Sequence, residues 1–132
     1  ADDKLALVRE GAAALAYPSH PNCRDYRANE DLGRPIRHAS EAPVPLRALV
    51  MLSRSKAQSE PTLTAVAGAQ RLPEALPSLL YHFSRDALAP ARELARIVDT
   101  VPVYALVMPD DIECIEATVD CVLSEFIQAP PW

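Results

Sequence analysis

Two strand-length apolar runs place the strongest constraint on the fold of this chain. Residues 46–52 and 101–108 are nearly continuous in apolar side chains, and the first run lies between a proline and a polar segment. Such runs predict strands that are covered on both faces, as in an α/β sheet. Residues 46–52 are expected to be the central strand, whereas Pro102 confines the start of the second strand to a sheet edge or a first position.

The segments around these runs carry helical patterns. A short helix is expected over residues 63–70, with Thr62 as its N-cap. Helices are also expected over residues 73–83 and about 86–100, because apolar residues recur there at spacings of three and four. A last helix is expected after Asp110, which resembles an N-cap with Glu113 completing a capping box. The core-facing stripe of this last helix is predicted to contain Ile112, Ile115, Val119, Val122, Leu123 and Phe126.

The first part of the chain predicts a hairpin followed by a long connection. Residues 4–9 and 13–17 have strand character around a short turn, and residues 18–45 combine prolines and charges without an apolar period. The order of elements predicts an α/β fold in which helices cover a mixed sheet. Because 132 residues suffice for one sizeable core, a single domain over residues 1–132 is expected.

Composition excludes several classes of partner. The formal net charge of -5 leaves no basic footprint for nucleic acid or for an anionic membrane, and the longest apolar runs fall short of the roughly 20 residues of a membrane span. Cys114 and Cys121 lie two turns apart on one predicted helix, which argues against a disulfide between them. The odd cysteine count, completed by Cys23, favours a reducing compartment, and a cytoplasmic location is expected.

Two adjacent carboxylates, Asp2 and Asp3, stand directly before the first strand-like run. Paired carboxylates at the edge of a buried strand are costly unless a cation, a proton or a hydrogen-bond donor compensates them, so they indicate a site; a solvated chain end is the alternative. We interpret the pair as the end of an earlier strand and turn that would precede the first residue. With glycine only at positions 11, 33 and 68, neither GxxxxGK[ST] nor GxGxxG occurs in this chain.

Three segments carry a resemblance to a known family. Residues 1–8 (ADDKLALV) resemble the segment after the phosphate loop and its helix in the HPr kinase/phosphorylase-like family, where an Asp-Asp turn joins two strands. Residues 45–52 (PLRALVML) and 101–104 (VPVY) with the following acid-capped helix are similar to later segments of its shorter members. The resemblance implies the C-terminal portion of a P-loop, PEP-carboxykinase-like kinase domain. The glycine loop, its lysine and its metal-binding hydroxyl are not in this chain.

The resemblance also implies roles for particular residues. In ATP-dependent transfer to a hydroxyl, Asp3 would be the base toward the acceptor and Asp2 the partner of Mg²⁺, with the order of the two left open. Lys4 and Arg37 would lie near the phosphates; a solvated Lys4 and an Arg37 paired with nearby acids are the alternatives. The acceptor would be a Ser or Thr of a protein or peptide, or a small molecule. A non-catalytic interaction or accessory module is the alternative function, and self-association through the apolar last helix stays open.

A metal or nucleophilic site in the long connection is not favoured. His20, Cys23 and His38 are its candidate residues, but no second Cys or His pair stands at zinc spacing. Nothing in the sequence orients a base toward Cys23 or supplies an oxyanion hole. Ordinary polar loop residues are the expected interpretation.

Overall fold

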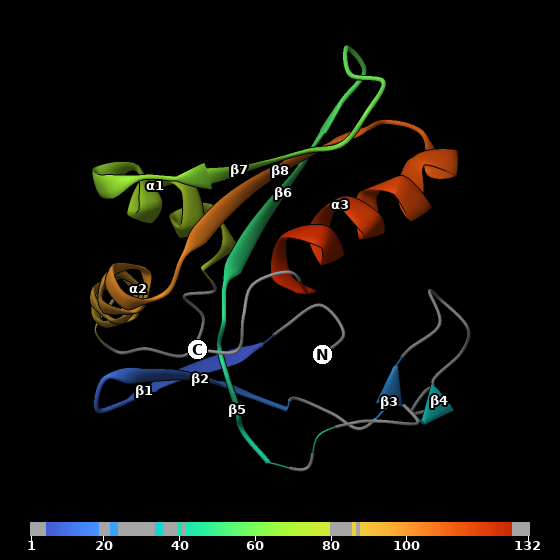
Figure 1. Cartoon of the computed structure of the whole chain (residues 1–132). Helices are drawn as coiled ribbons and strands as arrows, with labels where there is room; N and C mark the ends of the chain where they lie inside the picture. Colours follow the sequence, from blue (N-terminus) through green and yellow to red (C-terminus); the bar gives the residue numbers. More distant parts are fainter. Residues whose placement is uncertain are drawn as a thin grey trace. The chain divides into compact units, whose positions relative to one another are not determined.

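The computed structural model describes residues 5–18, 22–23, 34–35, 40, 42–79, 86 and 88–127. Contacts divide the chain into two compact units, Ala1–Arg47 and Ala48–Trp132, each described by itself below (Figure 1). Chain length predicts a single domain over residues 1–132, and the division into two units leaves this a prediction.

The first unit is built on the predicted hairpin. Strands β1 (Ala6–Glu10) and β2 (Ala13–Tyr17) pair antiparallel, with Ala6 opposite Tyr17. The connecting turn needs Gly11, whose φ of 62° lies in the left-handed region that favours glycine. The outer edge of β2 pairs with β5 (Val44–Pro45).

The long connection of the first unit contains more regular structure than its sequence predicts. Besides β5, it holds β3 (Asn22–Cys23) and β4 (Arg34–Pro35), which pair antiparallel with each other. The expectation of a structureless loop over residues 18–45 is therefore wrong at these positions. Two-residue strands leave no alternating pattern in a sequence, because period-two alternation needs about four residues to be visible.

The second unit contains a mixed sheet in the order β6-β8-β7 (Figure 1). Strand β6 (Leu49–Ser55) is parallel to β8 (Val103–Pro109), and β7 (Thr62–Val66) is antiparallel to β8 on its other side. The predicted α/β class with a mixed sheet is thus confirmed. The prediction that residues 46–52 form the central strand is wrong: β8 is central, and β6 is an edge of this sheet within the described residues.

Strand β7 replaces a helix that the sequence predicts. The expected helix over residues 63–70 is wrong, because residues 62–66 pair along β8 and only η1 (Gly68–Gln70), a short 3-10 helix, follows. Thr62, Thr64 and Val66 are β-branched and recur at period two, which favours a strand once a partner edge is available.

The helices are shorter than expected except at the C-terminal end. Helix α1 (Arg71–Ala75) runs into the 3-10 helix η2 (Leu76–Ser78), so the predicted helix over residues 73–83 ends early within the described residues. Pro77 cannot donate the backbone hydrogen bond that would continue α1. Helix α2 (Ala89–Thr100) confirms the third predicted helix, with Pro90 in its first turn.

The last helical segment consists of η3 (Ile112–Cys114) and α3 (Ile115–Ile127). Its N-cap is Asp111, whose carboxylate accepts a hydrogen bond of 3.0 Å from the Glu113 backbone N–H, so the prediction of Asp110 as N-cap is wrong by one residue. Asp110 still belongs to the sheet, because its N–H donates to the Ser55 carbonyl at 3.2 Å.

Alternating side chains assign the helices of this unit to opposite faces of the sheet. Val103 packs with Leu94 and Val98 of α2 and with α1, so this face of β8 is covered by α1 and α2. Tyr104, which points the other way, packs edge-to-face on Phe126 of α3 with ring centroids 5.2 Å apart. The sheet therefore lies between α1 and α2 on one face and α3 on the other (Figure 1).

Candidate functional site

The residues predicted to carry chemistry lie outside the described part of the chain. Asp2, Asp3, Lys4 and Arg37 are not among the described residues, so their roles stay predictions. The strand expected after the Asp pair is present as β1. His20 and His38 also lie outside the described residues, and Cys23 is described only as part of the β3 backbone.

Two tyrosines among the described residues donate hydrogen bonds to carboxylates. Tyr17 donates to Glu10 at 2.9 Å across the hairpin, and this hydrogen bond is the largest cause that raises the pKa of the Tyr17 hydroxyl. In the second unit, burial is the largest cause that raises the pKa of Tyr104, followed by the charge of Glu125 and its hydrogen bond of 3.4 Å. Within the described ranges, no three His, Cys, Asp or Glu side chains are grouped so as to hold a metal ion.

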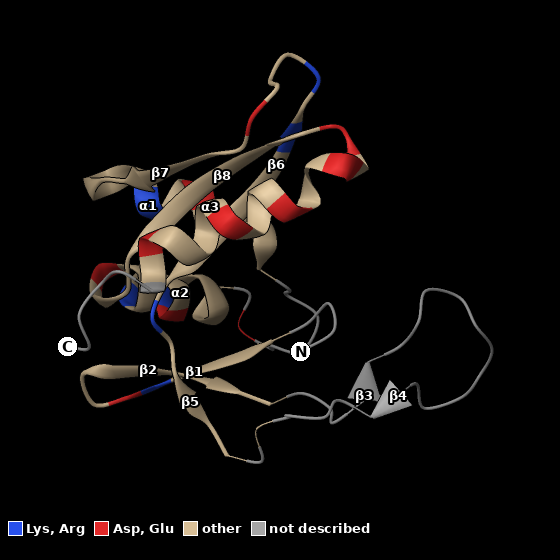
Figure 2. Ribbon diagram, turned by 45° about the vertical axis from the view of Figure 1, so that its right-hand side comes forward, with Lys and Arg blue, Asp and Glu red and all other residues tan. Residues whose placement is uncertain are grey.

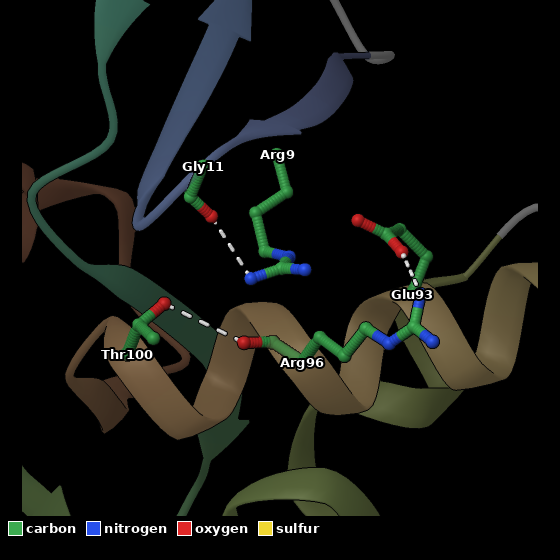
Figure 3. A network of polar contacts seen from close by, with 5 residues as sticks. All are labelled: Arg9, Gly11, Glu93, Arg96 and Thr100. Carbon is green, nitrogen blue, oxygen red and sulfur yellow. Dashed lines mark hydrogen bonds and ion pairs between the residues drawn. The ribbon is translucent and has the colours of Figure 1, made fainter.

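Figure 3 shows polar contacts on the hairpin and on α2. Arg9 donates to the Gly11 carbonyl at 3.0 Å, which closes the β1–β2 turn. On α2, Arg96 pairs with Glu93 at 3.2 Å, and the Thr100 hydroxyl donates to the Arg96 carbonyl at 3.5 Å. Exposed pairs of this kind contribute about 0–1 kcal/mol each, so these contacts add little to stability.

Helix α3 presents the most unusual surface in the described residues. Its sheet-facing side includes Thr118, whose hydroxyl donates to the Cys114 carbonyl at 2.8 Å, and Cys121, whose Sγ lies 4.0 Å from the Pro61 carbonyl oxygen, in addition to Phe126. The four larger aliphatic side chains that precede and follow these positions are exposed. We call them the α3 stripe: Ile112 (79% exposed), Ile115 (47%), Val119 (49%) and Leu123 (44%).

The α3 stripe corrects a prediction made from the sequence. Its four residues were expected to face the core, whereas only Val122 and Phe126 of the predicted stripe are even partly buried. The physical reason is that this helix has apolar or small residues on two faces. The small residues at 114, 118 and 121 allow close approach to the sheet, and no apolar period distinguishes that face from the larger aliphatic one.

A further exposed apolar residue, Leu52, lies on the same side of the sheet as α3. Leu52 of β6 stands opposite Leu106 of β8, and paired residues share a sheet face. Leu106 is buried on the face covered by α3, whereas Leu52 is 61% exposed. Helix α3 thus leaves β6 open on this face.

The α3 stripe lies on the flank of the helix that is nearer to β6. Cys121 approaches Pro61, the residue before β7, so the opposite flank of α3 is turned away from β7. At 100° per residue, Val119 lies on that opposite flank. We call the surface formed by Leu52 and the α3 stripe the α3–β6 face.

Negative charge accompanies the α3–β6 face. Residues 110–127 contain six carboxylates and no Lys or Arg, and Figure 2 shows red acidic segments along the otherwise tan ribbon of α3. At 100° per residue, Glu116 and Asp120 lie next to the α3 stripe, on the side of the helix that faces solvent. Arg54 of β6, on the same sheet face as Leu52, pairs with Asp110 at 3.9 Å, so the negative potential is confined to the α3 side of this surface, where no basic residue of the helix neutralises Glu116 and Asp120.

Comparison with known proteins supplies no relative: no family model, no curated protein and no solved structure matches the chain. The candidate site therefore rests on the geometry of this chain alone. Among the described residues, no helix has the length and apolarity that crossing a lipid bilayer requires.

Proposed function

We propose that this chain is a non-catalytic interaction module that binds a partner protein through the α3–β6 face. The observation that carries the proposal is the α3 stripe, in which aliphatic side chains on consecutive helical turns are exposed. A surface helix normally turns such a stripe toward the core, and contiguous exposed apolar residues are typical of protein interfaces. Leu52 extends the apolar surface from the helix onto the sheet.

Burial of these side chains supplies the free energy for binding. Removing an aliphatic side chain from water contributes about 1.5–3 kcal/mol when it becomes fully buried. The α3–β6 face offers several half-exposed side chains of this size, so a partner that covers them gains several such contributions before paying the cost of association.

Site-specific photocrosslinking in the native cell tests this function. Benzoylphenylalanine at Val119 is expected to give a discrete adduct with one protein. The matched control is Asp99, which is exposed on α2 on the other side of the sheet. Absence of an adduct from position 119, or the same adduct from both positions, would contradict the proposal.

The second candidate function is the one implied by the family resemblance: the C-terminal portion of an HPr-kinase-like, ATP- and Mg²⁺-dependent kinase of the P-loop, PEP-carboxykinase-like type, acting in the cytoplasm on a hydroxyl. What favours it is the order along the chain, since Asp2 and Asp3 stand directly before the β1–β2 hairpin. In that family the Asp pair also leads into a strand.

Transfer assays on the complete native gene product test this second candidate. Under it, Asp3→Asn abolishes phosphoryl transfer and leaves folding intact, while Asp99→Asn, a matched change on the exposed face of α2, leaves transfer unchanged. Transfer that persists in Asp3→Asn would exclude Asp3 as the base. A product that binds no ATP in the presence of Mg²⁺ would exclude the kinase function altogether.

A further inference from the structure

We infer that the occupant of the α3–β6 face is an amphipathic helix of a partner protein that carries Lys or Arg beside its apolar stripe. The inference rests on the proposed interaction function and adds the conformation and the charge of the bound segment. Three features of the second unit support it: the uneven cover of the sheet, the spacing of the α3 stripe and the charge beside it.

The uneven cover of the sheet indicates a helix. One face of the sheet is covered by α1 and α2, whereas the described residues place only α3 on the other. A helix is about 10–12 Å wide and strands lie about 4.8 Å apart, so one helix covers about two strands. Helix α3 covers β7 and β8, which leaves β6 and Leu52 for a second helix beside it.

The spacing of the α3 stripe fits such a neighbour. Ile115, Val119 and Leu123 recur every four residues and therefore form an i±4 ridge along the helix. Ridges of this kind pack into the grooves of an adjacent helix at an interaxial distance of about 8–10 Å. A partner helix with apolar residues at i, i+3, i+4 and i+7 would pack against both this ridge and Leu52.

The charge beside the stripe selects the partner. Glu116 and Asp120 border the α3 stripe, and residues 110–127 hold no Lys or Arg. A bound helix with Lys or Arg along its edge meets complementary charge, which raises the association rate and excludes acidic competitors. Two copies of this chain that met through α3 would bring like charges together, so a second copy is disfavoured.

A designed peptide tests the charge and the conformation. The probe is a fluorescent helical peptide of about 15 residues, because shorter helices are marginal in water. It has leucines at i, i+3, i+4 and i+7 and lysines on the flanks. We expect saturable binding to the 132-residue chain by anisotropy. The same peptide with glutamates in place of the lysines is expected to bind at least about tenfold more weakly, and a scrambled peptide of the same composition not measurably.

Variants of the chain locate the binding. Val119→Asn with Leu123→Asn is expected to abolish peptide binding, while Glu116→Lys with Asp120→Lys reverses the preference toward the glutamate peptide. Asp99→Lys is the control that leaves both affinities unchanged. All these positions are exposed, so each variant should keep the native unfolding midpoint. Equal binding of the lysine, glutamate and scrambled peptides, or no binding of any of them, would overturn the inference.

The crosslinked segment separates failure of this inference from failure of the proposed function. If the adduct at Val119 contains a basic amphipathic segment, both stand. If it contains an acidic or extended segment, or a second copy of this chain, the inference fails while the interaction function stands. If no adduct forms, the function itself fails.

Discussion

At the scale of single residues, the neighbours Thr118 and Val119 have opposite environments. Thr118 is buried with its hydroxyl satisfied inside the helix, whereas Val119 is half exposed. Hydrophobicity alone predicts a buried Val119 and an exposed Thr118. The two side chains have nearly the same size and shape, so position on the helix decides: Thr118 shares the sheet-facing side of α3 with Cys121, and Val119 does not.

Substitution by aspartate distinguishes the two positions. Thr118→Asp is expected to lower the free energy of unfolding by about 3 kcal/mol or more, because it buries an unpaired charge. Val119→Asp, on the solvent side, is expected to change it by less than about 1 kcal/mol. Urea unfolding of the two variants measures the difference. The reverse order of stabilities would show that Val119 faces the core, as hydrophobicity predicts.

Tyr104 makes stability depend on pH in the alkaline range. Burial raises its pKa in the folded chain above the ordinary value of 10.0, with Glu125 acting in the same direction. The unfolded chain then loses this proton first as pH rises, so the contribution is complete below about pH 10 and declines above it. Tyr104→Phe is expected to make the loss of stability above pH 10 shallower, as measured by urea unfolding. An unchanged slope would contradict this assignment.

At the scale of elements, β6 and β8 exchange the roles that their sequences suggest. Both strands come from nearly continuous apolar runs. Apolar composition therefore does not identify which of them is central. Strand β8 becomes central because β7 pairs with its free edge, and its residues Val103, Leu106 and Met108 are buried on both faces. The outer edge of β6 has no described strand beside it.

Proline substitutions test the edge position of β6. The Leu49 N–H donates to the Pro102 carbonyl, so N–H groups of odd-numbered residues in β6 point toward β8 and those of even-numbered residues point outward. Ser53→Pro is expected to cost about 3 kcal/mol of unfolding free energy, because it removes a ladder hydrogen bond. Arg54→Pro is expected to cost clearly less, since its ion pair with Asp110 at 3.9 Å is exposed. Equal costs in denaturant unfolding would indicate a strand paired on both sides.

At the scale of the whole molecule, the two compact units differ in what they bury. The described residues of the first unit include only two buried hydrophobic side chains, Ala14 and Ala16, whereas the second unit buries Leu94, Ile97 and Val103 among others. Apolar stabilisation scales with buried area, so alanines contribute much less than branched residues. The second unit therefore holds the larger share of the core.

Hydrogen exchange is expected to report this difference. Backbone amides of β8 should exchange more slowly than those of β2, because opening β8 exposes the larger core. Amide-resolved exchange of the whole chain at neutral pH measures both strands in one experiment. Equal protection of β2 and β8 would instead indicate a single cooperative domain over residues 1–132.

Local patterns in the sequence determined much of this protein's secondary structure. The β1–β2 hairpin, both apolar strands, α2 and the position of the last helix follow from residues close together in the chain, because strand alternation, helical spacing and caps act over a few residues. The same patterns failed for β7, whose residues acquire strand structure by pairing with β8 some forty positions away in the sequence.

Tertiary structure alone decided the strand order and the exposed face of α3. Which strand is central depends on pairing between distant segments, and a helix with two apolar faces has no local signal for the face that packs. The candidate α3–β6 face could not be predicted for this reason: Leu52 and the α3 stripe are apolar, and sequence assigns such residues to the core. The stripe is exposed because Thr118 and Cys121 lie on the sheet-facing side of α3, and Leu52 is exposed because β6 is at the edge of the described sheet; only the folded chain decides both.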